Sequence, residues 1–190
     1  MFARTPRLLL RPGWREDAPA LAAAIGDFAI VSRLARAPWP YTLADAEAFL
    51  AADHGSLPNF LIFARTLGAP RLVGGIALDA TEEGVELGYW IARSYWGLGF
   101  ATEAGRAMMD IADNGLRLPT LRAGHFADNA ASGRVLTKLG FQPTGTLSTR
   151  MCRARDMVVN CVEFERRAFA TTSSDEDASI GYDREAALAA

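Results

Sequence analysis

Two glycines stand where a strand pattern gives way to a helix pattern, and their spacing could bind an anion. Gly97 and Gly99 flank Leu98, and apolar residues at helical intervals begin directly after them, at Phe100. Glycine has no Cβ atom, so the backbone can approach a ligand closely, and the first N–H groups of a helix lack partners within it. These groups and the helix dipole favour a nearby negative charge by about 0.3–1 kcal/mol. The pattern predicts a pyrophosphate site, although two glycines before a helix also occur in an ordinary turn.

Two common nucleotide-binding patterns do not fit these glycines. A dinucleotide-binding loop needs a third small residue where this chain has Thr102. It also needs an acidic residue about 20 positions later, where the chain reads PTL at 119–121. A nucleoside-triphosphate loop needs Gly-Lys-Ser/Thr where Phe100 and Ala101 stand. Both classes of nucleotide site are therefore excluded.

The composition indicates one domain with its own hydrophobic core. Of the 190 residues, 50% are hydrophobic and 22% are charged, and the formal net charge is -2, so there is no cationic surplus to bind a nucleic acid. The two cysteines, Cys152 and Cys161, are too few for a disulfide framework or a four-ligand zinc site, so we expect no metal. The apolar run at residues 8–10 is too short for a signal peptide, and no stretch of roughly 18 apolar residues occurs. We therefore expect a cytoplasmic protein without a membrane partner.

Strand and helix patterns alternate in an order that predicts a mixed sheet flanked by helices. Helices are expected to begin after the capping candidates Asp17 and Thr42. Further helices are expected at 100–114 and 130–139, and strands at 7–11, 60–65, 72–78, 85–92, 120–126 and twice within 146–164. This order predicts an α/β fold of the mixed α+β kind, with a central mixed sheet of six to seven strands.

Three segments together resemble the GNAT N-acetyltransferases, specifically their RimJ/RimL-like branch. They are ELGYWI at 86–91, WGLGFATEA at 96–104 and DNAASGRVLTKLGF at 128–141. The family's phosphate loop is usually Gln/Arg-x-x-Gly-x-Gly/Ala, and here Ser94 occupies the leading position, which removes a side-chain contact and keeps the backbone cradle. The resemblance implies the GNAT acyl-CoA N-acyltransferase fold over residues 7–168. Residues 169–190 are then expected to be a flexible polar C-terminal tail.

The resemblance implies that acetyl-CoA binds as a co-substrate. Because the family splays its sheet at this strand, the backbone of Tyr89, Trp90 and Ile91 would pair with the pantetheine arm. The amides that would hold the pyrophosphate are those of Tyr95, Trp96, Gly97, Leu98, Gly99, Phe100, Ala101 and Thr102. By the same similarity Asn129 and Ser132 would face the cofactor near the thioester, although local helix capping could also account for both.

Acetyl transfer to an amine needs a proton acceptor and a proton donor. An amine with a pKa of about 10.4 (Lys) or about 7.7–8.0 (amino terminus) must lose a proton before it attacks. Glu86 is the expected base, acting through water, and a solvent-facing strand carboxylate is the alternative interpretation. Some family members carry a tyrosine acid at the position of Leu136, so Ser132 or a water molecule is the expected acid here. Trp39 and Tyr41, in a proline-rich loop, are expected to line the acceptor groove.

The predicted function is therefore an N-acetyltransferase that moves the acetyl group of acetyl-CoA to a primary amine by direct attack in a ternary complex. The sequence leaves open whether the acceptor is a protein N-terminus or a small molecule, and whether the protein is a monomer or a homodimer. Since Leu136 replaces a tyrosine, a non-catalytic acyl-CoA binding or sensing module is the alternative. A third possibility is an interaction domain that the same motifs only stabilise.

Overall fold

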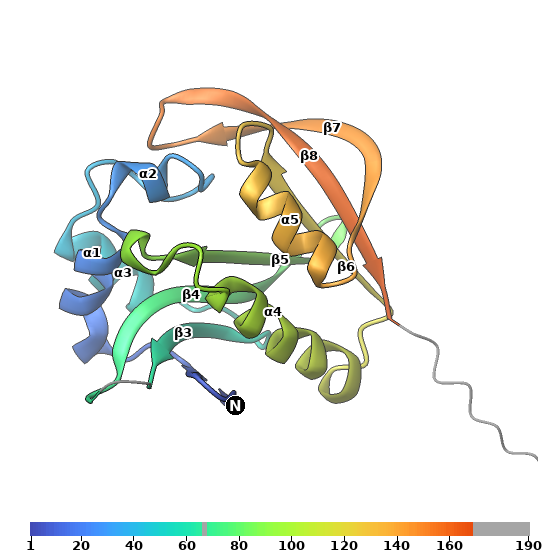
Figure 1. Cartoon of the computed structure of the whole chain (residues 1–190). Helices are drawn as coiled ribbons and strands as arrows, with labels where there is room; N and C mark the ends of the chain where they lie inside the picture. Colours follow the sequence, from blue (N-terminus) through green and yellow to red (C-terminus); the bar gives the residue numbers. More distant parts are fainter. Residues whose placement is uncertain (66–67, 169–190) are drawn as a thin grey trace, which may run out of the picture.

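The computed structural model describes residues 1–65 and 68–168, which form one eight-stranded sheet with helices on both faces (Figure 1). The strands are β1 (Ala3–Arg4), β2 (Leu8–Arg11), β3 (Asn59–Ala64), β4 (Arg71–Thr81), β5 (Gly84–Ile91), β6 (Thr120–Phe126), β7 (Gln142–Cys152) and β8 (Met157–Arg167). The helices are α1 (Ala18–Ile25), α2 (Phe28–Val31), α3 (Leu43–Ala51), α4 (Phe100–Asp110) and α5 (Ala130–Lys138). The predicted tail, 169–190, lies outside the described residues.

The sheet opens between β5 and β6. The strand order is β1-β2-β3-β4-β5-β6-β8-β7, and β5 and β6 form the parallel pair while the other neighbours are antiparallel. β5 and β6 meet at one register position, Glu86 opposite Arg122, although β5 continues to Ile91 and β6 to Phe126. The two strands therefore diverge towards their carboxyl ends, and the edge of β5 after Glu86 faces this opening.

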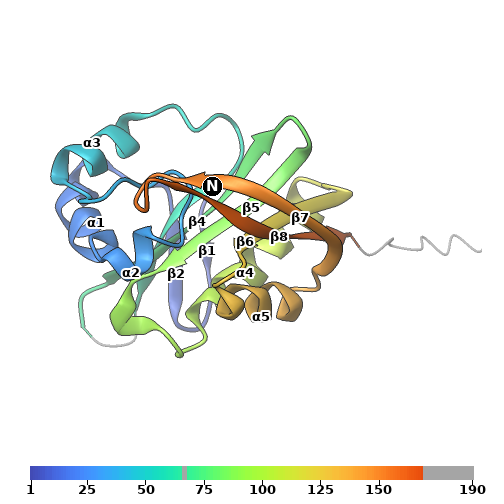
Figure 2. The same ribbon diagram turned by 90° about the horizontal axis from the view of Figure 1, so that it is seen from above.

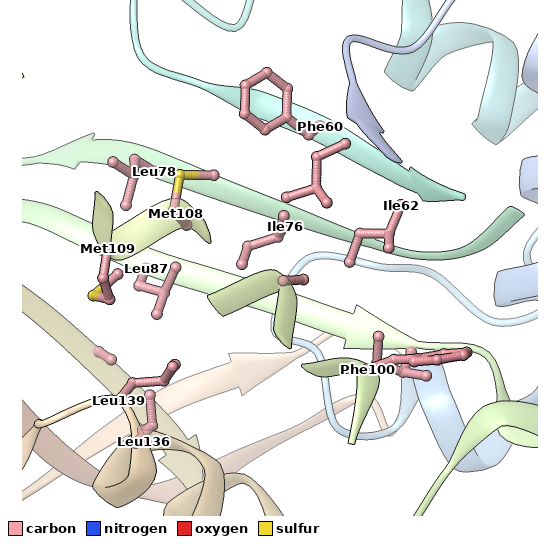
Figure 3. Close-up of a cluster of buried hydrophobic side chains, with 14 of the residues drawn as sticks. Phe60, Ile62, Ile76, Leu78, Leu87, Phe100, Met108, Met109, Leu136 and Leu139 are labelled. Carbon is pink, nitrogen blue, oxygen red and sulfur yellow. The ribbon is translucent and has the colours of Figure 1, made fainter. Parts of the chain in front are cut away.

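Each face of the sheet is covered by its own group of helices. α4 and α5 lie side by side on one face, and α1, α2 and α3 gather over the other (Figures 1 and 2). Figure 3 shows Met108 and Met109 of α4 with Leu136 of α5 and Leu139, the residue that follows this helix, in the largest buried cluster, which also includes Leu87 of β5. Burial of each large apolar side chain contributes about 1.5–3 kcal/mol, so this core fixes the two helices against the opening.

The structure differs from the sequence prediction in three short elements. It has eight strands rather than six to seven, because β1 folds back onto β2 through a turn in which the Thr5 amide donates to the Leu8 carbonyl at 3.0 Å. α2 was not expected, and the helix predicted at 100–114 changes at Ile111 into a π-helical turn, Ile111–Gly115. Elements of two to five residues are too short to carry a recognisable hydrophobic period.

The two predicted helix caps have different outcomes. Thr42 caps α3 as predicted, since its hydroxyl accepts from the Asp45 amide at 3.2 Å and Asp45 accepts from the Thr42 amide at 2.8 Å. The prediction for Asp17 was wrong. Its carboxylate accepts two hydrogen bonds from Arg11 instead, at 2.7 and 2.8 Å, so the side chain joins β2 to the start of α1. None of the helices within residues 1–65 and 68–168 is long and apolar enough to cross a membrane.

Candidate active site

Both glycines of the predicted anion site adopt the left-handed backbone conformation, which glycine reaches more easily than other residues. Gly97 has φ 77° and Gly99 has φ 80°, both in the left-handed region that costs other residues about 1–2 kcal/mol. Gly99 is the N-cap residue of α4, and no atom lies within 4 Å of where a Cβ of Gly97 would be. The amides of Tyr95 and Trp96 donate to the Ala92 and Arg93 carbonyls at 2.9 and 3.2 Å, so these two of the predicted amides are not free to bind a ligand. The N–H groups left at the start of α4 are those of residues 97–102. This arrangement can hold an anion.

A tryptophan fastens the end of β5 to this turn. The Trp96 indole Nε1 donates to the Ile91 carbonyl at 2.6 Å. The guanidinium of Arg33 lies 4.9 Å from the centre of the Trp96 ring, and that of Arg93 lies 5.8 Å from it. The indole therefore fixes the distance between the strand edge and the glycine turn. It also occupies the Ile91 carbonyl, one of the backbone groups predicted to pair with pantetheine.

The side chain of Tyr89 reaches α5 and meets Ser132. The phenol oxygen lies 2.7 Å from Ser132 Oγ and donates to the Ser132 carbonyl at 3.1 Å. Burial raises the pKa of Tyr89 to about 12, so the phenol is protonated at neutral pH. From the sequence, only the backbone of Tyr89 was expected to contact the coenzyme. The alternation of β5 could have placed its side chain, because Leu87 and Ile91 face the same α4–α5 core.

The phenol of Tyr89 lies near the position of α5 where some family members carry a tyrosine and this chain has Leu136. Leu136 is 1% exposed and packs in the main core, so its position carries no polar group. Tyr89 brings a phenol to the same helix from β5, one helical turn before Leu136. A tyrosine hydroxyl is therefore present beside Ser132, supplied by a strand rather than by α5.

Asn129 and Ser132 do not cap α5 with their side chains. Asn129 occupies the N-cap position without a side-chain capping hydrogen bond, and its Oδ1 accepts from Arg33 Nη1 at 3.3 Å. Ser132 is engaged by Tyr89. The capping interpretation is therefore wrong for both side chains. Arg33 was not identified from the sequence, because its contact with Asn129 joins residues 96 positions apart.

Glu86 lies on the opposite face of the sheet from Tyr89, in a network of charged side chains. Arg150 of β7 donates from Nη1 to Glu86 Oε1 at 2.5 Å and from Nη2 to both carboxylate oxygens of Glu163 at 3.1 Å. Gly124 of β6 makes room for this network, since a Cβ there would lie 3.0 Å from Arg150 Nη2. Burial lowers the pKa of Arg150, but the hydrogen bond and charge of Glu86 and the charge of Glu163 raise it overall. Glu86 is thus a paired carboxylate with a 23% exposed side chain, and not simply a solvent-facing one.

The loop between α2 and α3 closes the edge of the α1–α3 face. The β7–β8 turn contacts this loop, because the Arg153 amide donates to the Ala35 carbonyl at 3.1 Å and Arg155 Nε donates to the Ser32 carbonyl at 2.5 Å (Figure 2). Trp39 of the loop is 46% exposed. Tyr41 packs against the α1–α3 core, and burial, with the charge of Asp45, raises its pKa to about 12. Trp39 thus offers an exposed ring, whereas Tyr41 is held in the core.

Comparison with known proteins identifies the family. A model of the acetyltransferase (GNAT) domain matches residues 7–142, which is more than half of the chain. The chain therefore belongs to the GNAT acetyltransferase family. Within the described residues there is no group of three or more His, Cys, Asp or Glu side chains that could hold a metal ion.

Relatives and solved structures agree with this assignment. The chain is 37% identical over 79 residues to the uncharacterized N-acetyltransferase YoaA of Bacillus subtilis, a match that covers 42% of this chain and 45% of YoaA. The fold is similar to a GNAT-family acetyltransferase from Bacillus anthracis, with a TM-score of 0.75, 22% identity and coverage of 88% and 98% of the two chains. It is also similar to RimL, a ribosomal L7/L12 alpha-N-protein acetyltransferase in complex with coenzyme A, with a TM-score of 0.74, 19% identity and coverage of 88% and 98%. The curated relative thus matches over less than half its length, and the solved structures share the fold.

Proposed function

We propose that this protein is an acetyl-CoA-dependent N-acetyltransferase that transfers an acetyl group directly to a primary amine in a ternary complex. The opening between β5 and β6 carries the proposal, because it joins two differently equipped faces of the sheet. We name the α4–α5 face the coenzyme side and the α1–α3 face the acceptor side. The coenzyme side has the glycine turn and Ser132, and the acceptor side has Glu86.

On the coenzyme side the main chain would provide most of the binding. The edge of β5 after Glu86 faces the opening, so the backbone groups of Tyr89 and the amide of Ile91 would pair with the amides of a pantetheine arm. The Ile91 carbonyl is excluded, because it accepts from Trp96 Nε1. The pyrophosphate would lie against the N–H groups of residues 97–102, at the start of α4. RimL, which shares the fold, is described in complex with coenzyme A, and this supports a coenzyme A thioester as the donor.

The two sides supply the two proton transfers. Arg150 binds Glu86 Oε1, so the carboxylate is oriented and Oε2 would accept a proton from the amine through water. As the new C–N bond forms and the C–S bond breaks, Ser132 Oγ would protonate the leaving thiolate. Tyr89, at 2.7 Å, can replace the proton that Ser132 gives up. Backbone N–H groups at the opening would stabilise the developing oxyanion.

The acceptor we propose is a primary amine, either a protein N-terminus or a small molecule. RimL, which shares the fold, is a ribosomal L7/L12 alpha-N-protein acetyltransferase, and this supports testing protein N-termini first. The exposed ring of Trp39, with Tyr41 behind it, would line the entrance for the acceptor.

The test combines acetyl-CoA consumption and intact-mass detection of product over a panel of peptides and small amines. We expect turnover with at least one amine, and a fall in kcat of about 10²-fold in Glu86→Gln with no change in acetyl-CoA affinity. The matched control is Glu83→Gln, which removes a 75% exposed carboxylate just before β5. Binding without turnover on any amine would support the sensing module instead. If the protein is only an interaction domain, acetyl-CoA should not raise its melting temperature. If acetyl-CoA binds, a concentration of about 100 times its Kd should add about 2.7 kcal/mol to the free energy of unfolding and raise the melting temperature.

A further inference from the structure

The glycine turn before α4 is tied to the start of the chain by one arginine. Arg7 lies between β1 and β2, and its Nη1 donates to the Leu98 carbonyl at 3.0 Å. Its guanidinium lies 4.7 Å from the centre of the Phe100 ring. Its Nη2 would lie 3.6 Å from a Cβ at Gly99. Arg7 therefore adjoins three successive residues of the turn.

Arg7 is held in turn by Glu103, in the first turn of α4. Glu103 Oε2 accepts from Arg7 Nε at 2.6 Å, and Oε1 accepts from the Arg7 backbone amide at 3.0 Å and from the Thr5 hydroxyl at 2.5 Å. The Glu103 side chain is 16% exposed. Burial raises the pKa of Glu103, but hydrogen bonds from Thr5 and Arg7 and the charge of Arg7 lower it overall. The carboxylate is therefore ionised at neutral pH, and the β1–β2 turn and α4 are joined by a charged network.

The contact with Leu98 sets the direction of a neighbouring amide. The Leu98 carbonyl and the Gly99 N–H belong to one planar trans peptide unit, so they point to opposite sides of the chain. With the carbonyl held by Arg7, the Gly99 N–H points away from Arg7. Left-handed glycines have much conformational freedom, so a turn with two of them needs such an external contact to keep one orientation.

The same arginine compensates a charge that would oppose anion binding. Glu103 lies four residues after Gly99, and its amide donates to the Gly99 carbonyl at 3.0 Å. An unpaired carboxylate so close to the helix start would repel a diphosphate. Arg7 cancels this charge through its 2.6 Å contact.

We propose that Arg7 is a positioning residue for the diphosphate of the acyl donor, because it fixes the Leu98–Gly99 peptide and neutralises Glu103. This inference rests on the proposed function, since it requires a donor that carries a diphosphate. It assigns a binding role to a residue 91 positions away from the turn it orders.

The experiment compares two donors that differ in the diphosphate. Acetyl-CoA has it, whereas S-acetyl-pantetheine has the same thioester and arm without it. In Arg7→Met we expect the Kd for acetyl-CoA to rise about tenfold, as for loss of a charged hydrogen bond. The Kd for S-acetyl-pantetheine should not change. Arg4→Met is the matched control, because it removes the same charge from an exposed position on β1 and should leave both donors unaffected.

A lysine variant separates positioning from charge. Arg7→Lys keeps the cation but loses the planar fork that joins Leu98 to Glu103. We expect it to bind acetyl-CoA at least about threefold more weakly than the wild type. Full affinity in Arg7→Lys would overturn the proposal, since charge alone would then suffice. Equal losses for both donors in Arg7→Met, or no loss for either, would overturn it too.

Measuring acetyl-CoA binding and amine acetylation separately distinguishes a failure of this inference from a failure of the proposed function. If the wild type binds acetyl-CoA but acetylates no amine, the proposed function fails while the Arg7 result is still read from the two Kd values. If amines are acetylated and Arg7→Met binds both donors normally, the function stands and the role of Arg7 fails. A wild type that binds no acetyl-CoA contradicts both.

Discussion

The two sides of the β5–β6 opening present different chemical groups to it. On the coenzyme side the candidate groups are main-chain amides at two left-handed glycines and a pair of hydroxyls, Tyr89 and Ser132. On the acceptor side they are charged side chains, Glu86 and Glu163 around Arg150. Main-chain groups are placed by the fold itself, whereas side chains can be exchanged without changing it.

Apart from the Arg7–Glu103 pair at the glycine turn, the coenzyme side has neutral contacts and the acceptor side has partly exposed ionic ones. The Arg150 side chain is 31% exposed and that of Glu86 is 23% exposed. An ion pair in contact with water contributes little to stability, typically about 0–1 kcal/mol. The network around Arg150 therefore serves mainly to orient Glu86, and changes there should affect turnover more than folding.

The largest effect is expected from the hydroxyl pair on the coenzyme side. Ser132→Ala should lower kcat by about 10²-fold, because the thiolate loses its proton donor. Tyr89→Phe should have a smaller effect, and the double variant should be no slower than Ser132→Ala, since both groups act in one path. Steady-state kinetics with a fixed amine measures this, and the acetyl-CoA Kd should be unchanged.

Thr137→Val is the control for the hydroxyl pair. Thr137 is exposed on the same helix, where its hydroxyl donates to the Gly133 carbonyl at 3.0 Å. Its replacement should leave kcat unaltered. If Ser132→Ala keeps full kcat, water is the proton donor and the chemistry does not reside on the coenzyme side.

On the acceptor side, the next largest effect is expected from Gly88→Leu. Gly88 lies between Glu86 and Trp90 on the same face of β5. No atom of another part of the chain lies within 4 Å of where its Cβ would be. A leucine there should raise the KM for the amine roughly tenfold by steric obstruction. Gly88→Ala, with one methyl group, should have little effect, and both variants should bind acetyl-CoA normally. Weaker acetyl-CoA binding in Gly88→Leu would mean that the two sides are not independent.

Much of the fold was predictable because it depends on local patterns. The succession of strands and helices along the chain, the Thr42 cap and the glycine turn follow from hydrophobic periods and residue types within short windows. The resemblance pointed to Tyr89 and Ser132, and the structure adds the hydrogen bond between them.

The charged contacts were not predictable from the sequence. Arg150 reaches Glu86 across 64 residues, and Arg7 reaches Glu103 across 96. Twenty Lys and Arg and 22 Asp and Glu allow many pairings, and a pairing is selected only when distant strands are brought together. For the same reason Glu86 was considered as a solvent-facing carboxylate, whereas the folded chain pairs it with Arg150.

A smaller effect on the coenzyme side is expected from Gly97. Its φ of 77° is strained for alanine, and no neighbouring atom would clash with a Cβ. Gly97→Ala should weaken acetyl-CoA binding about fivefold, for a backbone cost of about 1 kcal/mol. Asparagine tolerates the left-handed conformation better, so Gly97→Asn should lose less. Isothermal titration with acetyl-CoA distinguishes the two. Equal losses would show that side-chain size, and not backbone conformation, limits the site.

The smallest effect compares the acid sensitivity of two ion pairs that differ in exposure, Glu103 with Arg7 and Asp128 with Arg155. Hydrogen bonds from Thr5 and Arg7 outweigh burial and lower the pKa of Glu103 from 4.5, and the Arg155 hydrogen bond lowers the pKa of Asp128 from 3.8. A carboxyl group with a lowered folded-state pKa stabilises the protein above its unfolded pKa. That contribution is lost as the pH falls through the folded-state value. The free energy of unfolding should therefore decrease below about pH 4.5.

The size of the loss should differ between the two pairs, since the Glu103 side chain is 16% exposed and that of Asp128 is 56% exposed. Urea unfolding at pH 7 and at pH 3.5 should show a smaller pH dependence in Glu103→Gln than in the wild type. Asp128→Asn should change it by no more than about 0.5 kcal/mol, because water screens that pair. A larger change in Asp128→Asn than in Glu103→Gln would mean that burial does not decide how strongly these two ion pairs stabilise the fold, and the contrast between buried and exposed contacts would then be wrong.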